Sequence, residues 1–435
     1  MAVSSEKISS APAARWLPWL WVPTLYFVEG IPNSLVDQVA PIFLKDLGFD
    51  NTRIATLAAT SYLPWVLKPL WGPLLEMHRT KRWWVVRLQL LGAAAVALLA
   101  GVLGAAPLWG FLLAALLLVA LLSATHDIVA DGFYLYGLEE KEQSFFVGIR
   151  NTAYRLAMVF CQGGIVGLVG WLAKEKQVAL ATAWVGVLFG LAAVQLGLAV
   201  CHARTLPRPE NDRPAPVEKG RVWAVFWETW RSFFARVGIG KLLAFLLLYR
   251  LAEVQLVRMA VLFLKDERVA GGLALGNEKL GLLNGTLGTV AMLGGGILGG
   301  MLVARNGLRR WVGPMVFIMH IPNLAFVGLA HWQPESLWWI GGALVLEKAG
   351  YGFGFTAYSI VMLRSAHGSL RTAHFAIMTG LMALGNMIPG YWVGPLQKAV
   401  GYEAFFWWVM LCTLPGFWVT WLMLRGGKPA EEKPA

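Results

Sequence analysis

Charged side chains are scarce in this chain: Asp, Glu, Lys and Arg make up 14% of its 435 residues, whereas hydrophobic residues make up 57%. The charged share of an ordinary soluble domain is about a quarter, so the composition excludes a soluble globular protein. A hydrocarbon core about 30 Å thick takes about 20 apolar residues per helical crossing. Such runs follow one another almost continuously from Trp16 to Leu424. We therefore expect an all-α bundle of membrane-spanning helices.

Cysteines and catalytic motifs are scarce as well. Cys161, Cys201 and Cys412 fall in or at the ends of apolar runs without metal-ligand spacing, so neither a disulfide framework nor a metal site is predicted. The chain has no G-x-S-x-G elbow, HExxH pair or P-loop. Many of its 48 glycines lie in apolar runs, where they serve close helix packing. We expect neither an enzyme nor a cofactor.

Basic residues give the chain a net charge of +12. If the N-terminus lies in the cytoplasm, 22 of the 37 Lys and Arg fall in inside segments and eight in outside segments. The positive-inside rule then places both termini in the cytoplasm. We interpret the basic charge as a topology signal and expect no nucleic-acid partner, because no basic face is interleaved with stacking aromatics. The first apolar run lacks a small-residue cleavage site and is interpreted as an uncleaved helix.

Twelve apolar runs divide into two groups of six. A polar interruption over residues 202–240 separates them and is predicted to be a cytoplasmic linker. Within it, Val222–Phe234 has the pattern of an amphipathic helix on the membrane surface. We expect a first half over 1–201, a second half over 241–424 and a polar cytoplasmic tail over 425–435. The predicted spans are 16–36, 53–75, 83–105, 108–137, 146–172, 178–201, 241–264, 279–304, 311–331, 337–363, 373–394 and 402–424.

The two halves resemble repeats, because each has a Gly-rich second span followed by a short basic turn, at Gly72–Arg82 and Gly300–Arg310. The first copy resembles the signature loop of the major facilitator superfamily, which has a glycine, an acid and paired basic residues. The resemblance implies a 6+6 pseudo-symmetric fold around a central cavity, with Glu76 and Arg82 as a gating or structural pair. The second copy has Ala304 where the acid is usual. A turn that only follows the positive-inside rule is the alternative.

Few ionisable side chains lie inside the predicted spans, where each is costly unless it is paired or faces water. They therefore mark candidate sites. Most of them lie on the first, fourth, seventh and tenth spans, which line the cavity in the superfamily plan. They are Glu29, Lys68, His126, Asp127, Asp131, Arg150, Arg155, Arg250, Glu253, Arg258, Glu347 and Lys348.

Two aspartates lie four residues apart on the fourth span, so both carboxylates leave one helix face and need cations or protons. They are Asp127 and Asp131. The turn near Lys141 pairs the fourth and fifth spans antiparallel, which makes Arg150 and Arg155 the expected partners. Two interpretations stay open. The cluster either fixes this hairpin and latches the cytoplasmic gate, or it handles protons or substrate.

Glu29 lies in mid-helix beside Gly30 and Pro32, which weaken the helix, and it has no cation nearby in the sequence. A lone buried carboxyl favours its protonated form and can load and unload a proton, as a proton-coupled symporter requires. The alternative is a static pair with Lys68 or Arg250.

The second half carries further candidates. Arg250 and Glu253 are three residues apart and can satisfy each other, which leaves Arg258 free for an anionic substrate group. Glu347 and Lys348 diverge by about 100° around their helix, so at most one faces the cavity directly. The candidates for proton coupling are Glu29, Asp127, Asp131, Glu253 and Glu347. The candidates for substrate binding are Lys68, His126, Arg250, Arg258 and Lys348.

Three stretches resemble the AmpG-type muropeptide permeases and their acetyl-CoA transporter relatives. Leu67–Glu76 reads LKPLWGPLLE, Ala124–Gly132 reads ATHDIVADG and Tyr154–Met158 reads YRLAM. The resemblance implies import of anhydromuropeptides across the bacterial inner membrane, driven by the proton gradient. The motif positions that this chain inherits are Asp127, Asp131 and Arg155.

Alternatives remain beside this importer. Gly132 and Phe133 are closer to the acetyl-CoA branch, which keeps a related anion transporter open. An exporter of a drug or metabolite stays open because no motif records the direction of transport. A non-transporting sensor needs an added soluble output domain, for which we see no room. The expected partners are a small-molecule substrate and the lipid bilayer, and the chain is expected to act as a monomer.

Overall fold

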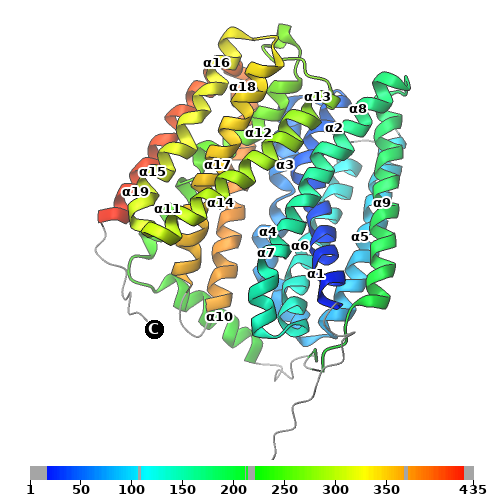
Figure 1. Ribbon diagram of the computed structural model, residues 1–435, viewed down its shortest axis with the longest axis vertical. Helices are drawn as coiled ribbons and strands as arrows, with labels where there is room; N and C mark the ends of the chain where they lie inside the picture. The colour runs from blue at the N-terminus through cyan, green and yellow to red at the C-terminus, as the bar shows by residue number, and fades with distance from the viewer. Residues whose placement is uncertain (1–16, 106–108, 211, 214–220, 367–370, 426–435) are drawn as a thin grey trace, which may run out of the picture.

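The computed structural model describes residues 17–425 except 106–108, 211, 214–220 and 367–370, and the described residues form helices and turns without any strand. Figure 1 shows two groups of helices side by side. The first half comprises α1 to α9, and the second half comprises α11 to α19. The link between them contains α10, which lies below the second half in this view.

The first half begins at Leu17 and ends at Thr205. Several of its long rods consist of consecutive elements, such as α1, η2 and α2. The elements are α1 (Leu17–Ser34), η2 (Leu35–Val39), α2 (Ala40–Asp46), α3 (Asn51–Thr60), α4 (Leu63–Met77), α5 (Lys81–Gly104), α6 (Trp109–Gly137), α7 (Glu140–Val159), η3 (Phe160–Ile165), α8 (Val166–Glu175) and α9 (Leu180–Thr205).

The link and the second half follow the same pattern. Helix α10 (Arg221–Phe234) occupies the segment for which the sequence predicts an amphipathic helix. The second half consists of α11 (Ile239–Leu248), α12 (Leu251–Lys265), η4 (Arg268–Ala270), α13 (Asn277–Leu280), η5 (Gly281–Leu287), α14 (Gly288–Asn306), α15 (Leu308–His320), η6 (Ile321–Asn323), α16 (Leu324–Trp332), α17 (Leu337–Ser365), α18 (Arg371–Leu411) and α19 (Thr413–Arg425).

Long apolar helices dominate the described part of the chain. Seven of them are long and apolar enough to cross a membrane, or eight if the pair 226–234 and 239–265, bent by 93°, counts as one span. Their exposed surfaces are largely apolar, as lipid contact requires. Near the start of α17, Trp338 and Trp339 are exposed, a position typical of an interfacial tryptophan.

Several predicted span boundaries are wrong. The first rod continues past residue 36 through η2 and α2 to Asp46, because Pro41 stands in the first turn of α2, where its missing N–H costs nothing. The predicted span 53–75 is broken between Thr60 and Leu63, and Pro64 follows in the first turn of α4. The predicted span 241–264 is broken as well, between α11 and α12.

The last two predicted spans adjoin each other in the structure. Helix α18 covers both the predicted span 373–394 and the beginning of 402–424. Its course changes at Gly401, where φ is +78°, a conformation that favours glycine. Two helices therefore meet at this residue with almost no loop.

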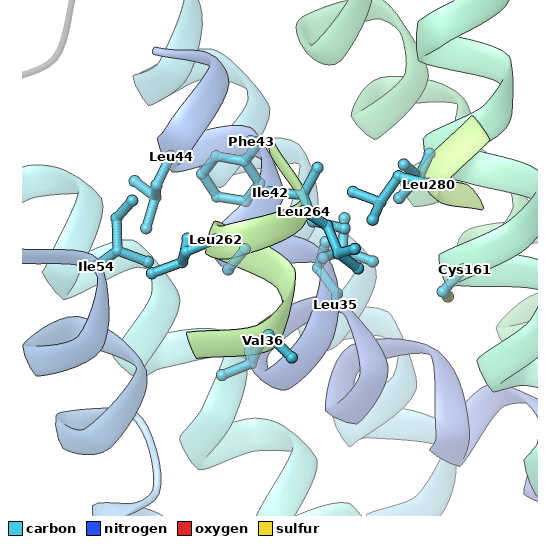
Figure 2. Packing of buried hydrophobic residues seen from close by; sticks show 14 of the residues in the cluster. Leu35, Val36, Ile42, Phe43, Leu44, Ile54, Cys161, Leu262, Leu264 and Leu280 are labelled. Carbon is cyan, nitrogen blue, oxygen red and sulfur yellow. The ribbon is translucent and has the colours of Figure 1, made fainter. Parts of the chain in front are cut away.

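One apolar core joins the two halves at the end of the bundle that carries α2 and the end of α12. Figure 2 shows side chains of both halves in contact there. We call this end the closed end, and we call the opposite end, where α1 begins and α19 ends, the terminal end. Labelled members from the first half are Leu35, Val36, Ile42, Phe43, Leu44, Ile54 and Cys161. Those from the second half are Leu262, Leu264 and Leu280.

Two π-helical segments, η3 and η5, contact each other between the halves. Their backbones approach closely because glycines occupy the contact. A Cβ on Gly285 would lie 2.5 Å from the carbonyl carbon of Gln162, and a Cβ on Gly163 would lie 2.3 Å from Thr286 Oγ1. Small residues are the usual means of close packing between helices in a bilayer. This contact fixes the distance between the two halves at mid-bundle.

We predict that Gly285→Ala destabilises the protein by about 1–3 kcal/mol, because the new methyl group overlaps backbone atoms that cannot rotate away. Thermal unfolding in detergent should show a lower midpoint than the wild type. Gly294→Ala in α14 is the matched control, since a Cβ there meets nothing within 4 Å. Equal midpoints for the two variants would contradict the close contact.

Candidate functional site

A group of charged side chains lies where α1, α4, α6 and α7 meet in the first half. Lys68 Nζ is 2.5 Å from Asp127 Oδ2, and Arg150 Nη1 is 3.0 Å from Asp131 Oδ1. The Tyr26 hydroxyl donates a 2.9 Å hydrogen bond to Asp131 Oδ1 and accepts one of 2.9 Å from Arg150 Nη1. Each aspartate therefore has its own cation. With the neighbouring glutamate, the first-half cluster consists of Glu29, Lys68, Asp127, Asp131 and Arg150.

The expected pairing of Asp127 with Arg155 is wrong. Lys68 on α4 takes that place, and Arg155 has no hydrogen bond or ion pair within the part of the chain that the structure describes. The reason is helical geometry. Arg150 and Arg155 are five residues apart on α7, so they diverge by about 140° around its axis. Only Arg150 can face the aspartates of α6.

Glu29 lies beside the first aspartate of this cluster and is 7% exposed. Its carboxyl group lies within hydrogen-bonding reach of that of Asp127. Apart from this contact, Glu29 Oε2 is buried without a hydrogen-bond donor. An ionised carboxylate only accepts hydrogen bonds, so a hydrogen bond between two carboxyl groups requires a proton on one of them. The static pair of Glu29 with Lys68 or Arg250 is not formed, because Lys68 contacts Asp127 and Arg250 contacts an aromatic group.

A second group of buried charges lies in the other half, where α12, η6 and α17 meet. Glu253 and Glu347 are 0% and 1% exposed, and their carboxyl groups lie within hydrogen-bonding reach of each other. Lys348 Nζ is 3.3 Å from Glu347 Oε2, and Asn323 Nδ2 lies 3.5 Å from Glu253 Oε2. Lys348 and Glu347 thus share one cluster although their Cα–Cβ bonds diverge, because the long lysine side chain returns to the carboxylate. The second-half cluster consists of Glu253, Glu347 and Lys348.

Arg250 does not pair with Glu253, contrary to the prediction, because it lies in the break before α12. Its Nη2 donates a 2.9 Å hydrogen bond to the Tyr351 hydroxyl. Its guanidinium carbon lies 5.6, 4.9 and 5.6 Å from the ring centres of Tyr351, Phe355 and Tyr358, within cation–π range. Its Nε is buried without a hydrogen-bond partner. Among the described residues, no carboxylate lies within ion-pair distance of this cation.

Arg258 is not free for a substrate, which corrects the second arginine prediction. Its Nη1 is 3.4 Å from Asp37 Oδ1, and its guanidinium lies 4.8 Å from the ring centre of Tyr62. Both partners belong to the first half, so Arg258 connects the halves. The sequence did not reveal Asp37 as an interior charge, because the first span was expected to end one residue earlier.

His126 is not part of the charged cluster, although its neighbour in the chain is Asp127. It is buried against α5 and α9, with Nε2 3.1 Å from Gln89 Nε2. Gln89 Oε1 is 2.8 Å from His202 Nδ1, and His202 Nε2 is 2.8 Å from the Thr24 hydroxyl. This polar chain lies inside the first half. The substrate contact of His126 stays a prediction, and the structure shows only that the ring lies in this polar chain.

The side chain of Glu76 lies outside the described residues, so only one member of the predicted signature-loop pair is visible. Arg82 donates from Nη2 to the Ala203 carbonyl at 2.5 Å and from Nε to the Leu206 carbonyl at 3.1 Å. Its backbone N–H donates a hydrogen bond of 2.9 Å to Asp212 Oδ2. An arginine at the end of a helix commonly satisfies the last carbonyls in this way. Arg82 is the second residue of α5, so it fastens the start of α5 to the end of α9.

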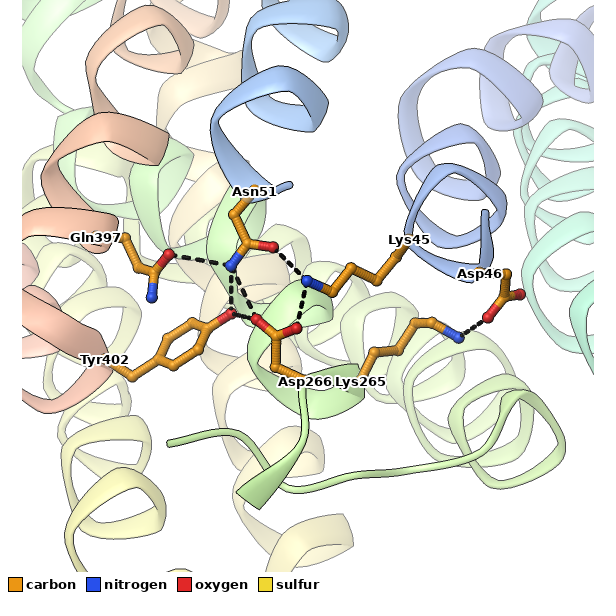
Figure 3. A network of polar contacts seen from close by, with 7 residues as sticks. All are labelled: Lys45, Asp46, Asn51, Lys265, Asp266, Gln397 and Tyr402. Carbon is orange, nitrogen blue, oxygen red and sulfur yellow. Dashed lines mark hydrogen bonds and ion pairs between the residues drawn. The ribbon is translucent and has the colours of Figure 1, made fainter. Parts of the chain in front are cut away.

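The closed end is held by a polar network that the sequence analysis missed. Figure 3 shows its members from both halves. Lys45 pairs with Asp266, and Lys265 Nζ lies 2.5 Å from Asp46 Oδ1. Asn51 Nδ2 lies 2.9 Å from Asp266 Oδ2 and donates at similar distances to two groups of α18, the Gln397 amide oxygen and the Tyr402 hydroxyl.

A repeated tetrapeptide supplies the charges of this network. Residues 43–46 and residues 263–266 both read Phe-Leu-Lys-Asp, at the end of α2 and at the end of α12. Each lysine pairs with the aspartate of the other copy. The repeat was the signal available in the sequence, but only its lysines, Lys45 and Lys265, enter the sequence analysis, as two of the eight basic residues of the outside segments.

We predict that Asp266→Lys destabilises the closed end by about 3 kcal/mol, because it leaves Lys45 facing a like charge in a largely buried interface. The double variant Lys45→Asp, Asp266→Lys should recover a large part of this loss. Thermal unfolding of purified protein measures both. Glu335→Lys is the control, since Glu335 is exposed in the loop before α17.

No rescue by the double variant would contradict a direct interaction between these two side chains. A loss of equal size in the control would show that the effect is a general response to added positive charge.

Two helical halves with charged groups among long apolar helices, and with one end closed by ion pairs and hydrogen bonds, are the architecture of a membrane transport protein. The chain belongs to the Major Facilitator Superfamily, whose family model matches residues 24–390. It is a multi-pass membrane transporter of small molecules and not an enzyme.

Two relatives align over most of the chain. An uncharacterized protein of Haemophilus influenzae is 26% identical over 427 residues, which cover 93% of this chain and 95% of that protein. The anhydromuropeptide permease of Escherichia coli (strain K12) is 27% identical over 405 residues, which cover 90% of this chain and 77% of the permease. The AmpG-like resemblance inferred from the three sequence motifs is confirmed.

Solved structures show the same fold at low identity. A D-xylose–proton symporter matches with a TM-score of 0.72 and 11% identity, covering 96% of this chain and 98% of that one. A bacterial homologue of the lysosomal transporter Spinster, in an inward-facing and occupied conformation, matches with a TM-score of 0.70 and 14% identity, covering 95% and 97%. These likenesses establish the architecture.

Proposed function

We propose that this chain imports a polar, anionic solute of the anhydromuropeptide class across a bacterial inner membrane, driven by the proton gradient. On this proposal, the helices form twelve spans in two halves of six, both termini are cytoplasmic and one chain is the functional unit. The solute binds between the halves, which open alternately toward either side.

The distribution of positive charge supports this orientation. The turns and helix ends at the terminal end contain most of the loop Lys and Arg. They include Arg79 before α5, Arg82 in its first turn, Arg204 at the end of α9, and Arg309 and Arg310 at the start of α15. The positive-inside rule assigns such a side to the cytoplasm. The closed end is then periplasmic.

The contacts between the halves support an inward-facing conformation. Ion pairs that join the halves, as far as the chain is described, are Lys45–Asp266, Lys265–Asp46, Lys174–Glu278 and Arg258–Asp37. The ion pairs whose members have the most hydrogen-bond partners lie at the closed end. None of the four ion pairs lies at the terminal end. Opening toward the periplasm requires that the closed-end network breaks.

The observation that carries proton coupling is the position of the buried Glu29 carboxyl, whose Oε2 has no hydrogen-bond donor, beside the carboxyl group of Asp127. With one proton on this pair, the first-half cluster has two negative and two positive charges and is neutral. Without that proton it carries an excess negative charge at the buried Glu29 carboxyl, which is costly unless water or a cation reaches it. Loading and unloading of the proton therefore changes the free energy difference between closed and water-exposed conformations.

Arg250 is the evidence that the substrate carries an anionic group. It is a permanent cation with a free Nε and no carboxylate partner in the described chain, so a substrate carboxylate is its natural counter-ion. The aromatic rings of Tyr351, Phe355 and Tyr358 lie around it and offer apolar faces to a sugar ring. A muropeptide carries both groups, a sugar and a peptide with carboxylates.

Uptake of labelled anhydromuropeptide into right-side-out membrane vesicles tests this function. We expect accumulation when the outside is acidified and its collapse when a protonophore removes the gradient. Inverted vesicles test the direction of transport. Absence of gradient-dependent flux in both preparations would overturn the muropeptide proposal, while proton-driven extrusion would make the chain an exporter.

We predict that Glu29→Gln abolishes accumulation but preserves counterflow exchange of labelled for unlabelled solute. The amide stays neutral at every pH, so binding and conformational exchange continue while the proton can no longer leave. Glu335→Gln is the control, because Glu335 is exposed in the loop before α17. Proton-driven accumulation by the Glu29→Gln variant would exclude Glu29 as the coupling residue.

We predict that Arg250→Gln weakens solute binding about tenfold to a hundredfold, as expected for the loss of a charge-assisted hydrogen bond. Arg250→Lys should retain part of the affinity, since it keeps the charge but loses the planar donor group. Equilibrium binding in detergent measures both variants. Unchanged affinity for a carboxylate-bearing solute in Arg250→Gln would contradict this assignment.

A further inference from the structure

The two halves contain matching sets of buried groups that the internal repeat places on corresponding helices. Glu29 and Asp127 lie on α1 and α6, and Glu253 and Glu347 lie on α12 and α17. In each pair the two carboxyl groups lie within hydrogen-bonding reach of each other, and one lysine contacts the second member. The two sets match in the chemistry of their groups but not in their position along the helices. Glu253 stands ten residues before the tetrapeptide 263–266, whereas Glu29 stands fourteen before its copy.

The contacts of Glu253 and Glu347 leave both groups short of hydrogen bonds. Glu253 Oε1 and both oxygens of Glu347 are buried without a donor, although Lys348 lies 3.3 Å from one of them. Two ionised carboxylates at hydrogen-bonding distance repel each other strongly, and buried acceptors without donors are rare. A single proton between the two groups removes the repulsion and supplies the missing donor, as in other carboxyl pairs that share one proton.

The charged groups around this pair determine the consequence of that proton. Lys348 contacts Glu347, and Arg250 lies at the start of the same helix as Glu253, with its guanidinium against Tyr351. If both carboxyls are ionised, the two cations and two anions balance. If one carboxyl is protonated, one positive charge remains, and Lys348 already has a partner. Arg250 is then the cation that lacks a counter-ion.

We propose that Glu253 and Glu347 form a second proton-binding site, which takes a proton from the water on one side of the membrane and releases it on the other. The inference rests on the proposed proton-coupled transport. The proton adds to a carboxylate to give a carboxylic acid, and its later release restores the carboxylate. Because the protonated pair leaves Arg250 without a counter-ion, proton binding at this site and anion binding at Arg250 strengthen each other.

Infrared spectroscopy of the purified protein in liposomes counts these protons without any substrate. Protonated carboxyl groups have a carbonyl-stretch band that carboxylates lack, and exposed carboxyl groups are ionised at neutral pH. We expect two such bands in the wild type, one from each pair. Glu29→Gln should remove one band, Glu253→Gln or Glu347→Gln the other, and Glu335→Gln neither.

The proposal can be overturned without any variant of α12 or α17, so the test does not depend on the folding of Glu253→Gln or Glu347→Gln. A single band that disappears completely in Glu29→Gln would exclude a proton at Glu253 and Glu347. Persistence of both bands in folded Glu253→Gln and Glu347→Gln would exclude it as well.

A transport measurement separates this inference from the proposed function. In proteoliposomes, we expect two protons per anhydromuropeptide for the wild type and one for Glu253→Gln. A wild-type ratio of one, with coupling intact, would overturn the second site alone. No coupling at all, together with two infrared bands, would overturn the proposed symport while leaving two protonated pairs in the resting protein.

Discussion

The cost of an unbalanced charge in an apolar interior governs where the ionisable residues of this chain lie. Asp127, Asp131 and Glu347 each have a cation in contact, and the two remaining interior glutamates each lie beside another carboxyl group. Arg250 is the cation whose partners are aromatic rings and a hydroxyl group. The site therefore consists of groups whose balance depends on a proton or an anion, while fully paired groups have a structural role.

The sequence was sufficient to find the class of protein and the interior charges, because both depend on local composition. It was insufficient to find their partners. Whether Asp127 meets Lys68 or Arg155 depends on how α4, α6 and α7 are rotated about their axes, and hydropathy does not record rotation. The break before α12 was also invisible, and it turns Arg250 away from Glu253.

Contacts between the halves are of two kinds, and they have different consequences. At mid-bundle, η3 and η5 touch through glycines, which allow the backbones to slide or rock at nearly constant distance. At the closed end, ion pairs and hydrogen bonds hold the halves together, and water can replace these groups when the end opens. The first contact is suited to a pivot and the second to a latch.

The repeated Phe-Leu-Lys-Asp has a consequence for the ancestry of the fold. In an interface with two-fold symmetry, a residue that contacts a second residue is matched by the reciprocal contact. Here each half contributes a lysine and an aspartate, and each lysine meets the other half's aspartate. Two identical copies of either half would form the same pairs. The latch is self-complementary and needs no divergence between halves, so a half-length ancestor that paired with itself would already have been able to close one side of the membrane.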